Sequence, residues 1–162
     1  TLKLINGIHY ALIALNASKA IIAIKKDKKE VIDLLSQLLD DKIEIVKVKN
    51  SYPVGWEKYL VNKIVKKNYE KIPLEVNTIV SNVSTIIAIN EAVKYNKPLI
   101  ERMVTITGYC LNEPINVYCK IGTSVHEILD YIGGIKHKYH KKHFILSIFC
   151  SGVSRMTQKK TP

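Results

Sequence analysis

The sequence predicts an α/β domain with a parallel sheet, followed by a smaller α+β domain, on three observations. Across residues 1–100, apolar residues at helical spacing alternate with short continuous apolar runs. Turn residues separate these segments, so each run can be a strand joined to the next by a helix, as parallel strands require. Beyond residue 100 the pattern changes to two extended segments, a helix and a Gly-Gly pair.

The first region is predicted to alternate helices and strands. Leu4, Ile8 and Leu12 recur at helical spacing, and Ala20–Ile24 is the continuous apolar run expected of a strand buried on both faces. Asn82 or Ser84 can cap a later helix. The predicted elements are helices at about 3–15, 28–39, 56–66 and 82–95, and strands at 20–24, 43–48 and 78–80.

The second region is predicted to be a small α+β domain. Extended segments at 103–107 and 115–120 precede a helix that opens after Gly122-Thr123-Ser124 and ends at Gly133-Gly134. A further strand is expected near 144–149. We therefore expect a partial α/β domain at 1–100, an α+β domain at 101–149 and an irregular tail at 150–162.

Composition argues against nucleic-acid binding. The chain has 47% hydrophobic residues, which suits a packed core, and a net charge of +11. Only Arg102 and Arg155 are arginines, whereas base-edge and bidentate phosphate recognition favour arginine. A solvated lysine surface is the expected state, with docking onto an acidic protein partner as the alternative.

No metal site or membrane span is predicted. The three cysteines include no C-x-x-C pair, which leaves zinc, iron–sulfur and disulfide sites without support and indicates a reducing cytoplasm. No apolar run reaches the roughly 18–20 residues that cross a bilayer. His137, His140 and His143 have a spacing that would suit a metal on a helix, but surface histidines among lysines are favoured.

The first candidate binding turn holds Pro53, Gly55 and Glu57. It lies between a predicted strand and a predicted helix, at the carboxyl end of the parallel sheet, where open α/β folds bind ligands. Gly55 would let the backbone approach a flat ligand or adopt positive φ, and Glu57 falls in the first helical turn. The alternative is a plain turn with an acidic residue at the start of a helix.

The second candidate turn is Ser81–Thr85, with Ser81, Asn82 and Thr85 as its polar members. Their hydroxyl and amide groups cluster where the first backbone N–H groups of a helix lack partners, which suits a phosphate or a polyol. The alternative is a helix N-cap with redundant capping residues.

These segments, taken in order, resemble the C subunit of the Rnf electron-transport complex and the proline reductase-associated electron-transfer protein. Both are similar to the FMN-carrying, NADH-oxidising subunit of respiratory complex I. The resemblance runs from about residue 1 to about residue 140. Its landmarks are Ala20–Ile24, Tyr52–Leu60, Val80–Thr85, Lys97–Arg102, Val104–Gly108, Ile121–Val125 and Gly133-Gly134.

The resemblance implies roles for both turns. The turn from Gly55 to Glu57 would line a flavin pocket, with its carboxylate near the flavin and the nicotinamide. Residues Ser81–Thr85 would contact the ribityl and phosphate groups of FMN. Trp56 stands where the complex I subunit has a second glutamate, and Ser81 replaces an asparagine. The implied cofactor-binding residues are Pro53, Gly55, Glu57, Ser81, Asn82 and Thr85.

The resemblance also bears on domains and cofactors. It implies a Rossmann-like FMN-binding domain, of which this chain has the carboxyl-terminal half, and an incomplete β-grasp (SLBB-like) domain. The family's glycine-rich flavin loop lies before the matching region, and its cysteine motifs for 4Fe-4S clusters lie after it. The chain begins with Thr1 rather than Met, and residues 147–162 depart from the family pattern, so we expect a fragment, from a truncated or frameshifted gene.

The implied function is electron transfer between NAD(H) or ferredoxin and further carriers through FMN. Partners would be other electron-transfer subunits or a ferredoxin-like carrier, on the cytoplasmic side, with any contact to the membrane made through partner subunits. No catalytic residue is required, and the fragment is not expected to be active alone. Two alternatives stay open: a soluble donor to a proline-reductase-type selenoenzyme, and a non-enzymatic ligand-binding or docking module.

Overall fold

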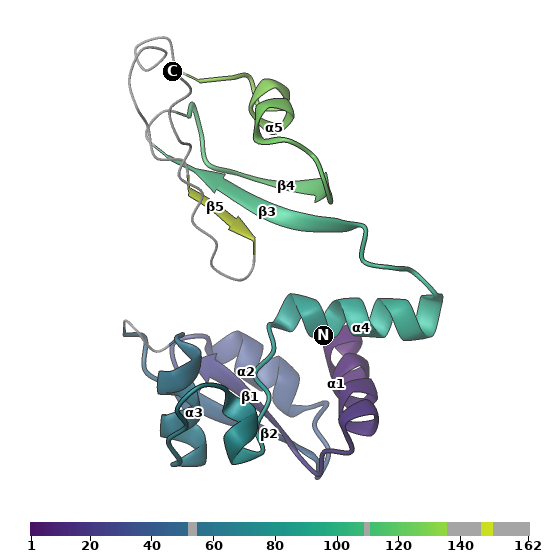
Figure 1. Ribbon diagram of the computed structural model, residues 1–162, viewed down its shortest axis with the longest axis vertical. Helices are drawn as coiled ribbons and strands as arrows, with labels where there is room; N and C mark the ends of the chain where they lie inside the picture. Colours follow the sequence, from purple (N-terminus) through teal and green to yellow (C-terminus); the bar gives the residue numbers. More distant parts are fainter. Residues whose placement is uncertain (52–54, 109–110, 136–146, 151–162) are drawn as a thin grey trace. The chain divides into compact units, whose positions relative to one another are not determined.

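A computed structural model describes residues 1–51, 55–108 and 111–135, and the backbone of 147–150. The chain divides into two compact units, Thr1–Lys97 and Pro98–Pro162, each with its own hydrophobic core (Figure 1). The first unit has mixed α/β structure with parallel strands, and the second has antiparallel strands and a helix. The coarse fold class predicted from the sequence is therefore confirmed.

From α1 to α3, the first unit follows the predicted alternation of helices and strands. β1 and β2 pair in parallel, from Ala20 opposite Ile43 to Lys25 opposite Val48, and α2 makes the crossover between them. The carboxyl ends of the two strands therefore lie at the same edge of the sheet. The elements are α1 (Leu2–Leu15), β1 (Ala20–Lys25), α2 (Lys29–Ser36), β2 (Ile43–Val48), α3 (Glu57–Val65), η1 (Pro73–Val76) and α4 (Val83–Tyr95).

The core of this unit forms where α1 and α2 meet the sheet. α1 buries Ile5, Ile8 and Leu12, which recur at three- and four-residue steps and so form one apolar stripe. This stripe belongs to one cluster with buried residues of β1, α2 and β2, which are Ile22, Leu35 and Ile43. Burial of side chains of this size is the main stabilising contribution to the unit.

α1 also packs against α4, and a glycine sets how closely the two helices approach (Figure 1). A Cβ atom on the buried Gly7 would lie 2.1 Å from the carbonyl oxygen of Ile86. Lys3 and Glu91 form an ion pair of 2.8 Å between the same helices. Asn90 of α4 is fully buried, with no partner for either side-chain polar atom among the described residues. The position of α4 therefore depends on a close contact along α1.

The strand predicted at residues 78–80 is absent, so this prediction was wrong. A 3-10 helix at Pro73–Val76 precedes it and ends at Asn77, which has a left-handed φ of 52°. Thr78 donates its backbone N–H to the carbonyl of Pro73 at 3.2 Å and its hydroxyl to the carbonyl of Val76 at 3.1 Å. The backbone N–H of Thr78, which would pair with a neighbouring strand in a sheet, is thus hydrogen-bonded within the turn. Within the described residues, the parallel sheet has two strands.

The second unit has an antiparallel sheet in the order β4-β3-β5, with α5 packed on it. Its elements are β3 (Glu101–Thr107), β4 (Ile115–Lys120), α5 (Val125–Tyr131) and β5 (Ser147–Cys150). Val104 and Ile106 of β3 are buried with Ile128 and Leu129 of α5. Gly133 and Gly134 have positive φ, as expected for glycines that end a helix.

Candidate functional site

The first candidate turn leads from β2 into α3. Trp56 has extended backbone and precedes Glu57, which is the first residue of the helix. A carboxylate at this position interacts favourably with the positive end of the helix dipole. Gly55 is exposed, and a Cβ atom placed on it would meet no atom within 4 Å among the residues that the structure describes. The packing of these residues therefore does not require glycine at 55. Pro53 lies outside the described residues.

Glu57 has a tertiary partner that the sequence did not indicate. Its Oε1 accepts a hydrogen bond of 3.2 Å from the hydroxyl of Tyr69, which is 7% exposed. Burial, together with the hydrogen bond to Glu57, raises the pKa of the Tyr69 phenol. The phenol therefore keeps its proton at neutral pH and can donate it in a hydrogen bond to an ionised carboxylate. The two residues are twelve positions apart, so no local motif points to the contact.

The segment that carries Tyr69 is held against the start of α3. The ammonium of Lys58 lies 5.6 Å from the centroid of the Tyr69 ring and donates to the carbonyl of Glu70 at 3.3 Å. The Glu75 carboxylate accepts from three successive backbone N–H groups, those of residues 70, 71 and 72, at 2.9 to 3.1 Å. These hydrogen bonds lower the pKa of Glu75. Tyr69 thus approaches Glu57 from an ordered segment.

The second candidate turn forms the start of α4. Asn82 is the N-cap, and its Oδ1 accepts from the backbone N–H and the hydroxyl of Ser84, both at 2.9 Å. Of the two cap residues considered from the sequence, Asn82 fills the role. Ser81 and Asn82 are exposed, and Thr85 is half-buried. No acidic residue lies in the first turn of α4, so its own side chains leave the positive end of the helix dipole unneutralised.

The two turns therefore offer different chemistry. The start of α3 presents a carboxylate, which accepts hydrogen bonds, whereas the start of α4 carries hydroxyl side chains at the positive end of a helix dipole, which suits an anion. Tyr69 orders the start of α3 through Glu57, and the Asn82 cap orders the start of α4. The start of α4 therefore suits an anionic group, and the start of α3 suits a group that donates hydrogen bonds.

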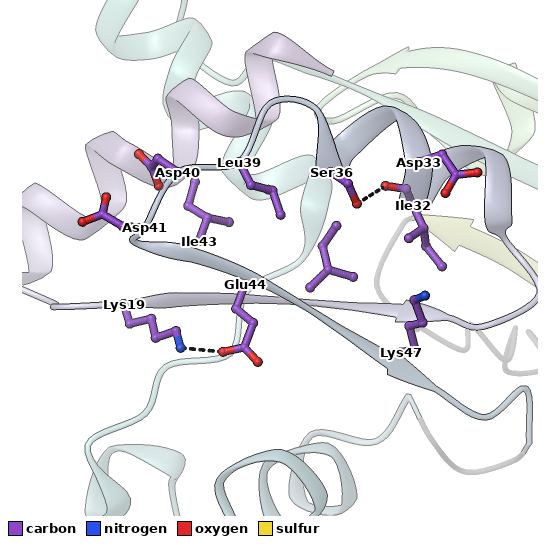
Figure 2. Close-up of a pocket in the computed structure, with 11 residues that line it drawn as sticks. Lys19, Ile32, Asp33, Ser36, Leu39, Asp40, Asp41, Ile43, Glu44 and Lys47 are labelled. Atoms are coloured by element: carbon purple, nitrogen blue, oxygen red, sulfur yellow. Dashed lines mark hydrogen bonds and ion pairs between the residues drawn. The ribbon is translucent and has the colours of Figure 1, made fainter.

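A hollow of about 590 Å³ lies elsewhere in the first unit, between α2 and β2 (Figure 2). Figure 2 shows Lys19 and Glu44 pointing toward one another there, and the hydroxyl of Ser36 directed at the carbonyl of Ile32. None of the predicted site residues lines the hollow, which is therefore separate from the candidate site.

Among the described residues, no group of three or more His, Cys, Asp or Glu side chains could hold a metal ion.

None of the helices in the described part of the chain combines the length and apolar character needed to cross a membrane.

Comparison with known proteins identifies both turns as part of a recognised domain. Residues 1–91 match the family model described as the Nuo51 FMN-binding domain. Over 139 residues the chain is 33% identical to the C subunit of the proton-translocating ferredoxin:NAD(+) oxidoreductase complex of Clostridium ljungdahlii, covering 84% of this chain and 30% of that protein. It is 34% identical over 134 residues to the C subunit of the ion-translocating oxidoreductase complex of Vibrio cholerae, covering 81% of this chain and 17% of that protein. The same subunit of Pseudomonas aeruginosa is 31% identical with the same coverage. The chain thus spans less than a third of the length of these relatives.

Proposed function

The chain belongs to the Nuo51 FMN-binding domain family, and on this premise we propose that it forms part of the FMN pocket of an electron-transfer subunit. The observation that carries the proposal is that the family match, residues 1–91, includes both candidate turns. The whole protein would pass electrons between ferredoxin or NAD(H) and further carriers. Support comes from the names of the relatives, which are subunits of ferredoxin:NAD(+) and ion-translocating oxidoreductase complexes.

The chemistry of the two turns supports FMN as the ligand. The phosphate and ribityl groups would bind at Ser81, Asn82 and Thr85, where α4 begins without a carboxylate of its own. The flavin ring would lie over Gly55, which is exposed, with Glu57 accepting a hydrogen bond from a ring N–H or a ribityl hydroxyl. Both turns would then form one wall of the pocket.

Bound FMN supplies the one- and two-electron chemistry, and the protein supplies position and electrostatics. Glu57 would place a negative charge near the ring, which would disfavour the added electron density of the reduced flavin. Trp56 departs from the complex I subunit, which has a glutamate there, so the handling of NAD(H) would differ from that of complex I.

The wider assignments belong to the proposal as well. The first domain, 1–100, would be part of a Rossmann-like fold, and the second, 101–149, a β-grasp (SLBB-like) domain followed by a tail at 150–162. The partners would be other electron-transfer subunits or a ferredoxin-like carrier, and the 4Fe-4S clusters would lie in a longer parent protein. The parent would be peripheral to the membrane, at its inner face.

The single tryptophan of the chain, Trp56, lies beside Gly55 and Glu57 and can report flavin binding. Titration with FMN is expected to quench its fluorescence saturably. Ser81→Ala and Thr85→Val should each weaken binding about two- to tenfold through the loss of a hydrogen bond. Ser36→Ala, on α2 beside the separate hollow, is the matched control and should bind like the parent chain. Saturable quenching that is the same in all four chains would contradict the proposal.

A further inference from the structure

We propose that Tyr69 is a positioning residue for Glu57, and that its hydroxyl fixes the carboxylate in the orientation used to bind the flavin. The inference rests on the proposed FMN site. Its basis is the 3.2 Å hydrogen bond from the Tyr69 hydroxyl to Oε1 of Glu57, between a phenol that is 7% exposed and a carboxylate that is exposed. Without this bond, Glu57 would be a solvent-facing side chain free to sample several rotamers.

Tyr69 can do this because it does not move freely itself. The Lys58 ammonium lies over one side of its ring, and the backbone that carries it is tied by the same lysine through the carbonyl of Glu70. Glu75 braces the next residues through three backbone N–H groups. The hydroxyl is therefore presented to Glu57 from a buried and fixed ring.

One hydrogen bond from Tyr69 leaves Glu57 able to bind a ligand. An ionised carboxylate has about four lone-pair sites on two oxygens and donates nothing. The phenol engages Oε1, and the remaining acceptor sites can serve an N–H or O–H group of the ligand. Ordering the side chain in advance removes part of the entropy cost that binding would otherwise carry. Tyr69 would thus act on the flavin only through Glu57.

The test is a double-mutant cycle of Tyr69→Phe and Glu57→Ala in the full 162-residue chain, with FMN affinity read from Trp56 fluorescence. Tyr69→Phe removes only the donor hydroxyl, and Glu57→Ala removes its acceptor. We expect Tyr69→Phe to weaken FMN binding about two- to tenfold in the parent chain and to have no effect beside Glu57→Ala. Tyr59→Phe is the control, since this tyrosine is 42% exposed and its ring lies near Lys63 rather than Glu57. Far-UV circular dichroism and urea unfolding check that each variant is folded.

The midpoint potential of the bound FMN is the second readout. Glu57→Ala removes the negative charge that would lie beside the ring and should raise the potential. Tyr69→Phe should shift it in the same direction by a smaller amount, and should not shift it beside Glu57→Ala. A general structural role of Tyr69 would not produce this dependence on Glu57.

The outcomes separate the two claims. Equal loss of affinity on Tyr69→Phe with and without Glu57, or no loss in the parent chain, would overturn the positioning role and leave the flavin site standing. Saturable FMN binding that Ser81→Ala and Thr85→Val leave unchanged would overturn the proposed function, and the role of Tyr69 with it.

Discussion

The two helix starts of the candidate site are ordered by different kinds of interaction. At α4, Asn82 caps the helix through Ser84, two residues away, so the turn is held by its own sequence. At α3, Glu57 depends on Tyr69, twelve residues away, and on the segment that Glu75 braces. The proposed phosphate side is therefore locally encoded, whereas the proposed ring side depends on tertiary structure. Substitutions that remove the interactions at one helix start should leave those at the other intact.

The largest effect is expected where α4 rests on α1. Gly7→Ala would place a Cβ atom 2.1 Å from the carbonyl oxygen of Ile86, next to Thr85. Overpacking against backbone should lower the free energy of unfolding by about 2–3 kcal/mol, despite the better helix propensity of alanine. Urea unfolding measures this. Ile13→Ala, at a position of the same helix that is 78% exposed, is the control and should change stability by less than about 0.5 kcal/mol. An unchanged Gly7→Ala chain would show that α4 does not rest on this contact.

A stabilising change is expected four residues further along α4. Asn90 is fully buried, with no partner for its amide among the described residues. Asn90→Leu removes the unsatisfied groups and should raise the free energy of unfolding by about 1 kcal/mol. Thermal or urea unfolding checks the sign, with Asn90→Ala as the comparison that leaves a cavity. A clear loss of stability in Asn90→Leu would mean that the amide has a partner, such as a buried water molecule.

The cap of α4 gives the next effect. Asn82→Ala removes the acceptor for the N–H and hydroxyl of Ser84, and should cost about 1 kcal/mol in urea unfolding. Asn82→Ser keeps an N-cap oxygen and should retain most of the stability. If alanine and serine behave alike, the cap contributes little to the order of this turn.

The smallest effect is a pH dependence confined to the α3 side. Hydrogen bonds from backbone N–H groups lower the pKa of Glu75. The ionised carboxylate therefore contributes fully to the free energy of unfolding above the ordinary glutamate pKa, and this contribution is lost as pH falls through the lowered pKa. Glu75→Gln should flatten the acid limb of the unfolding free energy measured against pH. A matched control is Glu70→Gln, an exposed acid on the same segment. Identical acid limbs for the parent chain and Glu75→Gln would contradict the bracing role.

Much of this architecture was accessible from sequence because local rules determine it. The spacing of Leu4, Ile8 and Leu12 predicted helix α1, in which Ile8 and Leu12 are buried and Leu4 is partly buried. Asn82 was one of the two caps predicted for α4, and it is the cap in the structure. The prediction of a strand at 78–80 was wrong because the hydrogen bonds of Thr78 to the preceding turn outweigh the β-propensity of a three-residue run. The contacts of Gly7 with Ile86 and of Tyr69 with Glu57 join residues far apart in the chain, and no spacing rule reports them.

The central claim is that the turns at 55–57 and 81–85 bind one FMN molecule together. The most direct measurement is the change in backbone amide NMR shifts of the isotope-labelled chain on titration with FMN. We expect the amides of Gly55, Glu57, Asn82 and Thr85 to shift along one binding curve, with the amides around Ser36 unchanged. Shifts limited to one of the two turns, or centred on the hollow between α2 and β2, would contradict the account.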